Sequence, residues 1–251
     1  MRLKRKSPGW AKRASAVTIS IALKKISSVL SSASTARPQR VRIWDIPTRL
    51  VHWLLVALVV FSWWSAENHY MEYHRYSGYV MLGALLFRVY WGLVGSSTAR
   101  FSYFVRGPQT TWQYLRSKSA ASSIGHNPLG ALSVITLLVL LLGQIALGLF
   151  AVDIDGIESG PLSYLVSFET GRVVAELHEW SFNGLLVFIT LHVAAVLFYL
   201  LIKHNNLIGP MITGMADATK ITSANTEIKF ASLWWAVPGA IMAALIVWTI
   251  A

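Results

Sequence analysis

Five long runs of apolar residues divide the chain, and segments rich in polar and charged residues separate them. The runs cover about residues 48–65, 74–94, 129–152, 173–202 and 233–251. Each is near the ~20 residues that a helix needs to cross the hydrocarbon core of a bilayer, and the fourth is longer. Backbone groups in lipid must be satisfied within the segment, so we expect helices rather than strands. The pattern predicts an all-α integral membrane protein.

Composition supports this prediction and narrows the chemistry. Hydrophobic residues make up 55% of the 251 residues, the mean hydropathy is +0.52, and only 13% of the residues are charged. That charged share is about half the usual value of ~25% for a soluble domain. The chain has no cysteine, which excludes disulfides, iron–sulfur clusters, thiolate-bound zinc and haem attached through a CxxCH motif. Histidine, and to a lesser extent methionine, is left as the metal ligand.

The formal net charge of +11 is concentrated in the N-terminal region and in particular loops. Residues 1–40 hold ten Lys or Arg and no acidic residue. Charge placed in this way is typical of orientation signals in membrane proteins, so we expect membrane lipid and no nucleic acid as a partner. We interpret residues 1–40 as a basic cytoplasmic arm. A cleaved or mistranslated leader is the alternative, although the short apolar run here lacks a clear cleavage site.

The loops predict the orientation of the helices. The loop between the second and third runs has four basic residues and no acid. The loop between the third and fourth runs carries four acids, with Glu176 just inside the fourth run, against Arg172. The positive-inside rule then places the N-terminus and the former loop in the cytoplasm. We divide the chain into the arm (1–40), a four-helix domain (41–205), a cytoplasmic linker (206–230) and a fifth transmembrane helix (231–251).

Four histidines lie at the ends of these apolar runs: His52, His74, His178 and His192. His178 and His192 are 14 residues apart on one predicted helix, so they face the same side and lie about 21 Å apart along its axis. Under the predicted topology, His52 and His192 share the cytoplasmic depth, and His74 and His178 share the outer depth. Two pairs at two depths, each with one partner from the fourth helix, match the needs of two bis-imidazole haems.

These side chains are also compatible with simpler roles. A histidine at a membrane interface can be a satisfied polar group, or part of an ion or proton pathway. Arg75 and Arg88 lie at depths where a guanidinium can bind a haem propionate, but each can also extend toward the lipid headgroups. His126 is expected to be a loop or cap residue at the start of the third helix, with contact to a propionate as the alternative.

Several motifs give the chain a family resemblance. The segments RIWDIPTRLVHWLL, YHRYSGYVMLGALLFRVYWGLVG, GHNPLGAL and LHEWSFNGLLVFITLHVAAVLFY occur in order between residues 41 and 205. They resemble the bacterial cytochrome b561 family, which includes the dihaem cytochrome b subunits of nickel–iron hydrogenases. The resemblance implies a four-helix bundle with two haems b, one held by His52 and His192 and the other by His74 and His178. The basic arm and the fifth helix depart from the family's pattern.

The sequence therefore predicts a dihaem b-type cytochrome in the bacterial inner membrane, with a cytoplasmic N-terminus. The resemblance implies electron exchange between the quinone pool and a c-type cytochrome or a periplasmic redox enzyme, with quinone as a further ligand. One alternative is the membrane-anchor cytochrome b subunit of a hydrogenase-like complex. A second, from another class, is a haem-free transporter or assembly protein.

Overall fold

The computed structural model describes residues 40–105, 125–155, 157–218 and 228–251, together with positions 24, 25, 27, 107, 109, 112, 113 and 116. The chain divides into two compact units, Met1–Gln39 and Arg40–Ala251. The predicted basic arm falls almost entirely outside the described residues. The helices of the membrane bundle all belong to the second unit.

Five helices in the described part of the chain are long and apolar enough to cross a membrane. They are α2 (Ile46–Glu67), α3 (Met71–Val94), α6 (Pro128–Phe150), α7 (Phe168–Leu201) and α9 (Ala236–Ile250), the last extended by a 3-10 turn at Leu233–Trp235. The prediction of an all-α membrane bundle with a fifth helix is confirmed. The first four helices begin one to five residues before the predicted apolar runs, because hydropathy does not detect polar first turns.

Polar caps set these earlier starts. The Asp45 side chain accepts a hydrogen bond from the backbone N–H of Thr48 at 2.9 Å and begins α2. Asn127 accepts from the backbone N–H of Gly130 at 2.7 Å and begins α6 in the same way. A proline follows directly in the first turn of both helices, where its fixed φ and missing N–H are compatible with a helix start.

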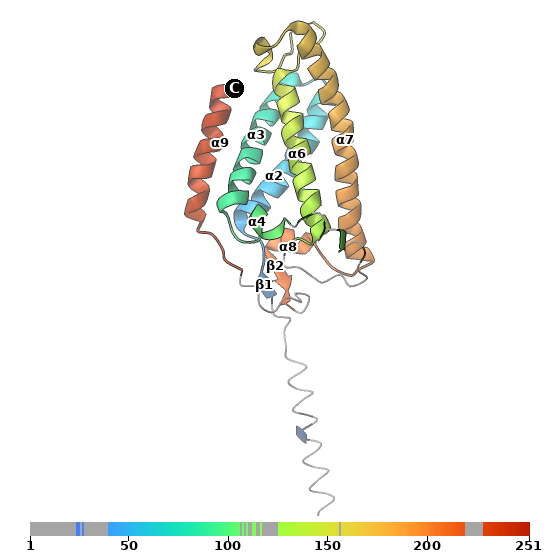
Figure 1. Ribbon diagram of the computed structural model, residues 1–251, viewed down its shortest axis with the longest axis vertical. Helices are drawn as coiled ribbons and strands as arrows, with labels where there is room; N and C mark the ends of the chain where they lie inside the picture. The colour runs from blue at the N-terminus through green and yellow to red at the C-terminus, as the bar shows by residue number, and fades with distance from the viewer. Residues whose placement is uncertain are drawn as a thin grey trace, which may run out of the picture. The chain divides into compact units, whose positions relative to one another are not determined.

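Two helix pairs build the bundle. α2 packs against α3 and α6 packs against α7, while α3 also contacts α6 and so joins the two pairs (Figure 1). The centre of this packing consists of the buried side chains Met81, Leu85, Leu138, Leu141 and Leu185. These residues come from α3, α6 and α7, so the core lies between the two pairs.

The fifth helix, α9, packs along α3 (Figure 1). Gly239 permits this approach, because a Cβ there would lie 2.3 Å from Cδ1 of Tyr90. Gly83 on α3 faces Val247, where a Cβ would make an ordinary contact at 3.6 Å, and Ala243 is buried. The two helices therefore meet at small residues, as is common for helix pairs in membranes.

The rest of the helix surfaces is suited to lipid. Only 6% of the most apolar stretch of α7 is buried inside the protein. Large apolar side chains such as Val187 on α7 and Trp248 on α9 are exposed. An apolar surface of this extent is unfavourable in water and favourable in a bilayer, which makes this a multi-pass membrane protein.

A small cap of irregular structure covers one end of the bundle. Strand β1 (Arg40–Arg42) pairs antiparallel with β2 (Met215–Asp217), which follows the short helix α8 (Ile208–Thr213). Residues 206–218 of the predicted linker thus form α8 and β2. The fully buried segment at 96–98 and helix α4 (Phe101–Phe104) complete the cap, and Ser97 binds the backbone of Lys229.

Candidate functional site

The four histidines predicted from the sequence lie in two groups. His74 and His178 line one cavity at the end of the bundle away from the cap. His52, His192 and His126 lie close enough together for a charge on one ring to affect another. The structure therefore brings together the two pairs that topology predicted, while their role as metal ligands stays a prediction.

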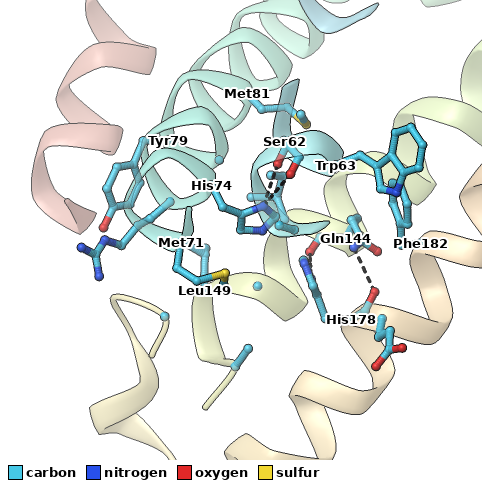
Figure 2. Close-up of a pocket in the computed structure, with 18 of the residues that line it drawn as sticks. Ser62, Trp63, Met71, His74, Tyr79, Met81, Gln144, Leu149, His178 and Phe182 are labelled. Carbon is cyan, nitrogen blue, oxygen red and sulfur yellow. Dashed lines mark hydrogen bonds between the residues drawn. The ribbon is translucent and has the colours of Figure 1, made fainter. Parts of the chain in front are cut away.

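The His74/His178 site is a cavity between four helices. Its volume is about 320 Å³, within the range of cofactor-sized pockets. The lining comes from α2, α3, α6, α7 and the segment at 158–161, and most of it is apolar. Figure 2 shows both imidazoles inside this cavity, with apolar side chains such as Met81 and Phe182 around them.

Main-chain carbonyls fix both imidazoles of this site. Nδ1 of His74 lies 2.9 Å from the carbonyl oxygen of Ser62 on α2, and Nδ1 of His178 lies 2.9 Å from the carbonyl oxygen of Gln144 on α6 (Figure 2). A carbonyl only accepts hydrogen bonds, so Nδ1 carries the proton in each ring. The lone pair is then left on Nε2, which is the arrangement found in metal-binding histidines.

The spacing of the two rings also suits a metal. Their centres are 6.0 Å apart and their planes are nearly perpendicular, at 89°. Two imidazoles that bind one ion from opposite sides, with bonds of about 2 Å each, have ring centres roughly 6 Å apart. The His74/His178 pair therefore has the separation that a single metal between two axial ligands requires.

Glycines on α3 and α6 leave room around these rings. A Cβ at Gly148 would lie 2.9 Å from Cε1 of His178, so the ring is tightly packed against the backbone of α6. A Cβ at Gly78, which also lines the cavity, would meet nothing within 4 Å. Helix surface without side chains beside two histidines allows a flat macrocycle to approach the backbone closely.

The His52/His192 site is built differently. Nδ1 of His192 lies 3.1 Å from the hydroxyl oxygen of Ser133 on α6, and a hydroxyl can both donate and accept. Nδ1 of His52 is buried and makes no hydrogen bond within the described ranges. The ring of His52 instead contacts Trp53, with centres 5.0 Å apart.

A third imidazole and a buried cation accompany this second pair. His126 is packed between the aromatic rings of Trp44 and Phe104, whose centres are 4.8 Å and 4.6 Å away. Burial lowers the pKa of His126 to about 3, and the charge of Arg88 acts in the same direction. His126 is therefore neutral, and it lies in the loop directly before Asn127, the N-cap of α6, as the sequence predicted.

Arg88 is 94% buried, so its charge needs compensation within the protein. Nη2 donates to the carbonyl of Ala99 at 3.3 Å, and the guanidinium lies 5.1 Å from the centre of the Phe101 ring. Asp45 interacts with it electrostatically, while Nη1 is buried and has no hydrogen-bond partner among the described residues. Arg75, in contrast, is half-buried and lines the His74/His178 cavity.

Residues 43–214 match the family described as prokaryotic cytochrome b561. The match covers both histidine pairs and the four helices α2, α3, α6 and α7. The chain belongs to this family.

As a member of the prokaryotic cytochrome b561 family, the chain is a membrane b-type cytochrome that functions in electron transfer. This membership favours the electron-transfer interpretation over the haem-free transporter. It also leaves α9 outside the matched region, in agreement with the departure noted from the sequence.

Several relatives carry names that point in the same direction. A probable Ni/Fe-hydrogenase B-type cytochrome subunit of Azotobacter chroococcum mcd 1 is 26% identical over 212 residues, covering 69% of this chain and 87% of that protein. The protein of the same name from Azotobacter vinelandii gives the same values. A probable Ni/Fe-hydrogenase 1 B-type cytochrome subunit of Escherichia coli (strain K12) is 24% identical over 208 residues, covering 68% of this chain and 88% of that protein. No solved structure matches the chain.

The residues of the His74/His178 site fit the haem b that the cytochrome b561 family implies. The two rings have the required separation and the required tautomer, and glycines provide a surface free of side chains. The apolar walls of the cavity would exclude water from the macrocycle. When bound, haem supplies a one-electron redox centre, while the protein supplies ligation, burial and charge.

The structure also reveals partners that the motifs of the b561 family did not suggest. Gln144 and Ser133 on α6 bind the histidines of α7, and the Ser62 carbonyl on α2 binds His74. The sequence held one indication of this: Gln144 is the only amide side chain within the apolar helix α6. The carbonyl partners have no such indication, because every residue has a carbonyl.

Proposed function

We propose that this cytochrome holds two haems b, one bound by His74 and His178 and the other by His52 and His192. The observation that carries the proposal is the geometry of the His74/His178 pair, with ring centres 6.0 Å apart and both Nδ1 atoms donating to carbonyls. The electrostatic interaction of His52 with His192 supports the second centre. The family supplies haem b as the cofactor.

The arrangement is suited to electron transfer and not to oxygen chemistry. If two of these imidazoles bind each haem iron, as proposed, the iron would have no position left for a substrate. His178 and His192 are 14 residues apart on α7, which corresponds to about 21 Å of helix. Two centres at this spacing carry electrons from one side of the hydrocarbon core to the other.

Arg88 and Arg75 are proposed to bind haem propionates. Arg88 has a buried Nη1 without a partner in the described ranges, and a carboxylate would supply both the missing acceptor and the missing charge. Arg75 lies at the other site, where it lines the cavity that holds His74 and His178. A half-buried arginine compensates charge more weakly than a buried one, so we assign Arg75 the smaller role.

We place the chain in the bacterial inner membrane with the cap, β1 and the N-terminus on the cytoplasmic side. The distribution of basic and acidic residues among the loops supports this orientation. The His52/His192 centre is then the inner one and the His74/His178 centre the outer one. The proposed exchange is between the quinone pool and a c-type cytochrome or another periplasmic redox enzyme.

A second candidate function is the membrane anchor of a hydrogenase-like enzyme. The names of the relatives, which are hydrogenase cytochrome subunits, favour it. Purification of the full chain from its native membrane under mild conditions would distinguish the two. A stoichiometric metalloenzyme that co-purifies would favour the anchor, and a b-type cytochrome without such a partner would favour the independent carrier.

Electron transfer across a bilayer tests the proposed function directly. The haem-loaded chain is placed in lipid vesicles that contain ferricyanide, and a reductant that does not cross the membrane is added outside. We expect bleaching of the enclosed ferricyanide that depends on the protein and on its haem content. Reduced haem without any bleaching would contradict the proposal.

A further inference from the structure

Gln144 is a buried amide in the middle of a membrane helix. It lies on α6 between apolar residues, and its exposed fraction is 8%. An amide in an apolar environment is unfavourable unless its donors and acceptor have partners. Its place beside the histidine site therefore calls for an explanation beyond packing.

The side-chain amide and the backbone carbonyl of Gln144 both form hydrogen bonds to α7. The side-chain Nε2 of Gln144 donates to the backbone carbonyl of His178 at 2.9 Å. The backbone carbonyl of Gln144 accepts from Nδ1 of the His178 ring, also at 2.9 Å. Its Oε1 accepts from the hydroxyl of Ser181, which also lies 3.1 Å from the carbonyl of His178. One residue of α6 thus binds both the ring and the main chain of one histidine on α7 (Figure 2).

We propose that Gln144 is a positioning residue that sets the height and the ring orientation of His178. This inference rests on the proposed function, because it takes His178 to be an axial ligand. The side-chain amide fixes the main chain of His178 against α6. The carbonyl of residue 144 is thereby kept in line with Nδ1, and Ser181 holds the amide in the rotamer that does this.

The bond to the carbonyl has a chemical consequence as well as a geometric one. An imidazole that donates Nδ1–H to a carbonyl is a more basic ligand, and a more basic ligand stabilises ferric over ferrous iron. If the amide is removed, the Nδ1–H bond is less well aligned and the ligand becomes less basic. The haem of this site then becomes easier to reduce, while the other haem is unaffected.

The experiment compares wild-type protein with Gln144→Leu, using the purified full chain with both haems. Redox titration and electron paramagnetic resonance report the potential and the axial-ligand orientation of each haem. We expect two haems per chain in both proteins. In Gln144→Leu, the reduction potential of the His74/His178 haem should become more positive and the g values of that haem should shift. The same haem should also transfer to apomyoglobin about 10-fold faster than in the wild-type protein.

Two further variants keep the test decisive. Ser181→Ala removes only the hydroxyl that supports the amide, so we expect a smaller shift in the same direction even if Gln144→Leu fails to fold. Val139→Ala changes an exposed α6 side chain and should change neither haem. Unchanged potentials and g values in both the Gln144 and Ser181 variants, or equal shifts in both haems, would overturn the inference. Wild-type protein without haem would refute the proposed function instead.

Discussion

The two histidine sites differ in what holds their rings. At the His74/His178 site, each imidazole donates to a main-chain carbonyl, and the ring of His178 packs against the backbone at Gly148. At the His52/His192 site, the ring of His192 meets the hydroxyl of Ser133, and the neighbouring His126 packs against Trp44 and lies near Arg88. Main-chain carbonyls accept from both rings of the first site, whereas the second site has a side-chain hydroxyl at His192, so substitutions should affect the two sites differently.

Removal of a ligand gives the largest expected effect. We expect His178→Ala to lose the haem of the His74/His178 site and keep the other, so that haem content falls from two per chain to one. His192→Ala should give the complementary loss, because each of these residues serves one centre only. Haem content measured after extraction, together with the reduced spectrum, decides this. Retention of both haems in either variant would show that the ligand assignment is wrong.

A smaller effect is expected from closing the space beside His178. Gly148→Ala places a Cβ where it would lie 2.9 Å from Cε1 of that ring, so the ring must move. We expect lower haem occupancy at this site alone, measured by haem content and by the optical spectrum.

Gly143→Ala is the matched control on the same helix, since its Cβ would meet nothing within 4 Å. Equal occupancy in Gly148→Ala and wild-type protein would argue against the close packing of the ring.

The buried cation offers a way to perturb the other site. Arg88→Gln removes a positive charge near His126 and leaves Asp45 uncompensated. Loss of a nearby cation favours the ferric state, so the potential of the His52/His192 haem should become more negative. Arg75→Gln should produce a smaller shift at the other haem because Arg75 is more exposed to solvent screening. If a redox titration of Arg88→Gln showed no shift in potential, the proposed contact between Arg88 and a haem propionate would be contradicted.

The smallest expected effects compare two serines. Ser133→Ala removes the hydroxyl 3.1 Å from Nδ1 of His192. Ser62→Ala also removes a hydroxyl 3.1 Å from Nδ1 of His74, but it leaves in place the main-chain carbonyl that accepts from the same Nδ1 at 2.9 Å. We expect a small positive shift in the potential of the His52/His192 haem for Ser133→Ala and a smaller shift at the other haem for Ser62→Ala. The opposite ranking in a redox titration would show that the distinction between the two sites is wrong.

The sequence predicted the helices and the pairing of the histidines because both follow from long-range regularities. Hydropathy marks the membrane spans, and the alternation of basic and acidic loops assigns a depth to each histidine. The helix starts at Asp45 and Asn127 lay just outside the apolar runs, so capping and not hydropathy determined them.

The hydrogen-bond partners of the histidines, the surroundings of His126 and the position of α9 depended on packing that a single sequence does not reveal. The partner of His74 is the carbonyl of Ser62, and a carbonyl is present whatever residue stands there. The burial of His126 between Trp44 and Phe104 follows from how the cap folds over the bundle. The packing of α9 on α3 depends on Gly239, whose small size is compatible with many other arrangements.

An experimental structure of the purified, haem-loaded chain at atomic resolution tests the central claim most directly. We predict one iron between Nε2 of His74 and Nε2 of His178, with both Nδ1 atoms still bound to the carbonyls of Ser62 and Gln144, and a second iron between His52 and His192. A structure in which His74 and His178 contact each other with no metal between them, or bind two different metals, would contradict the account.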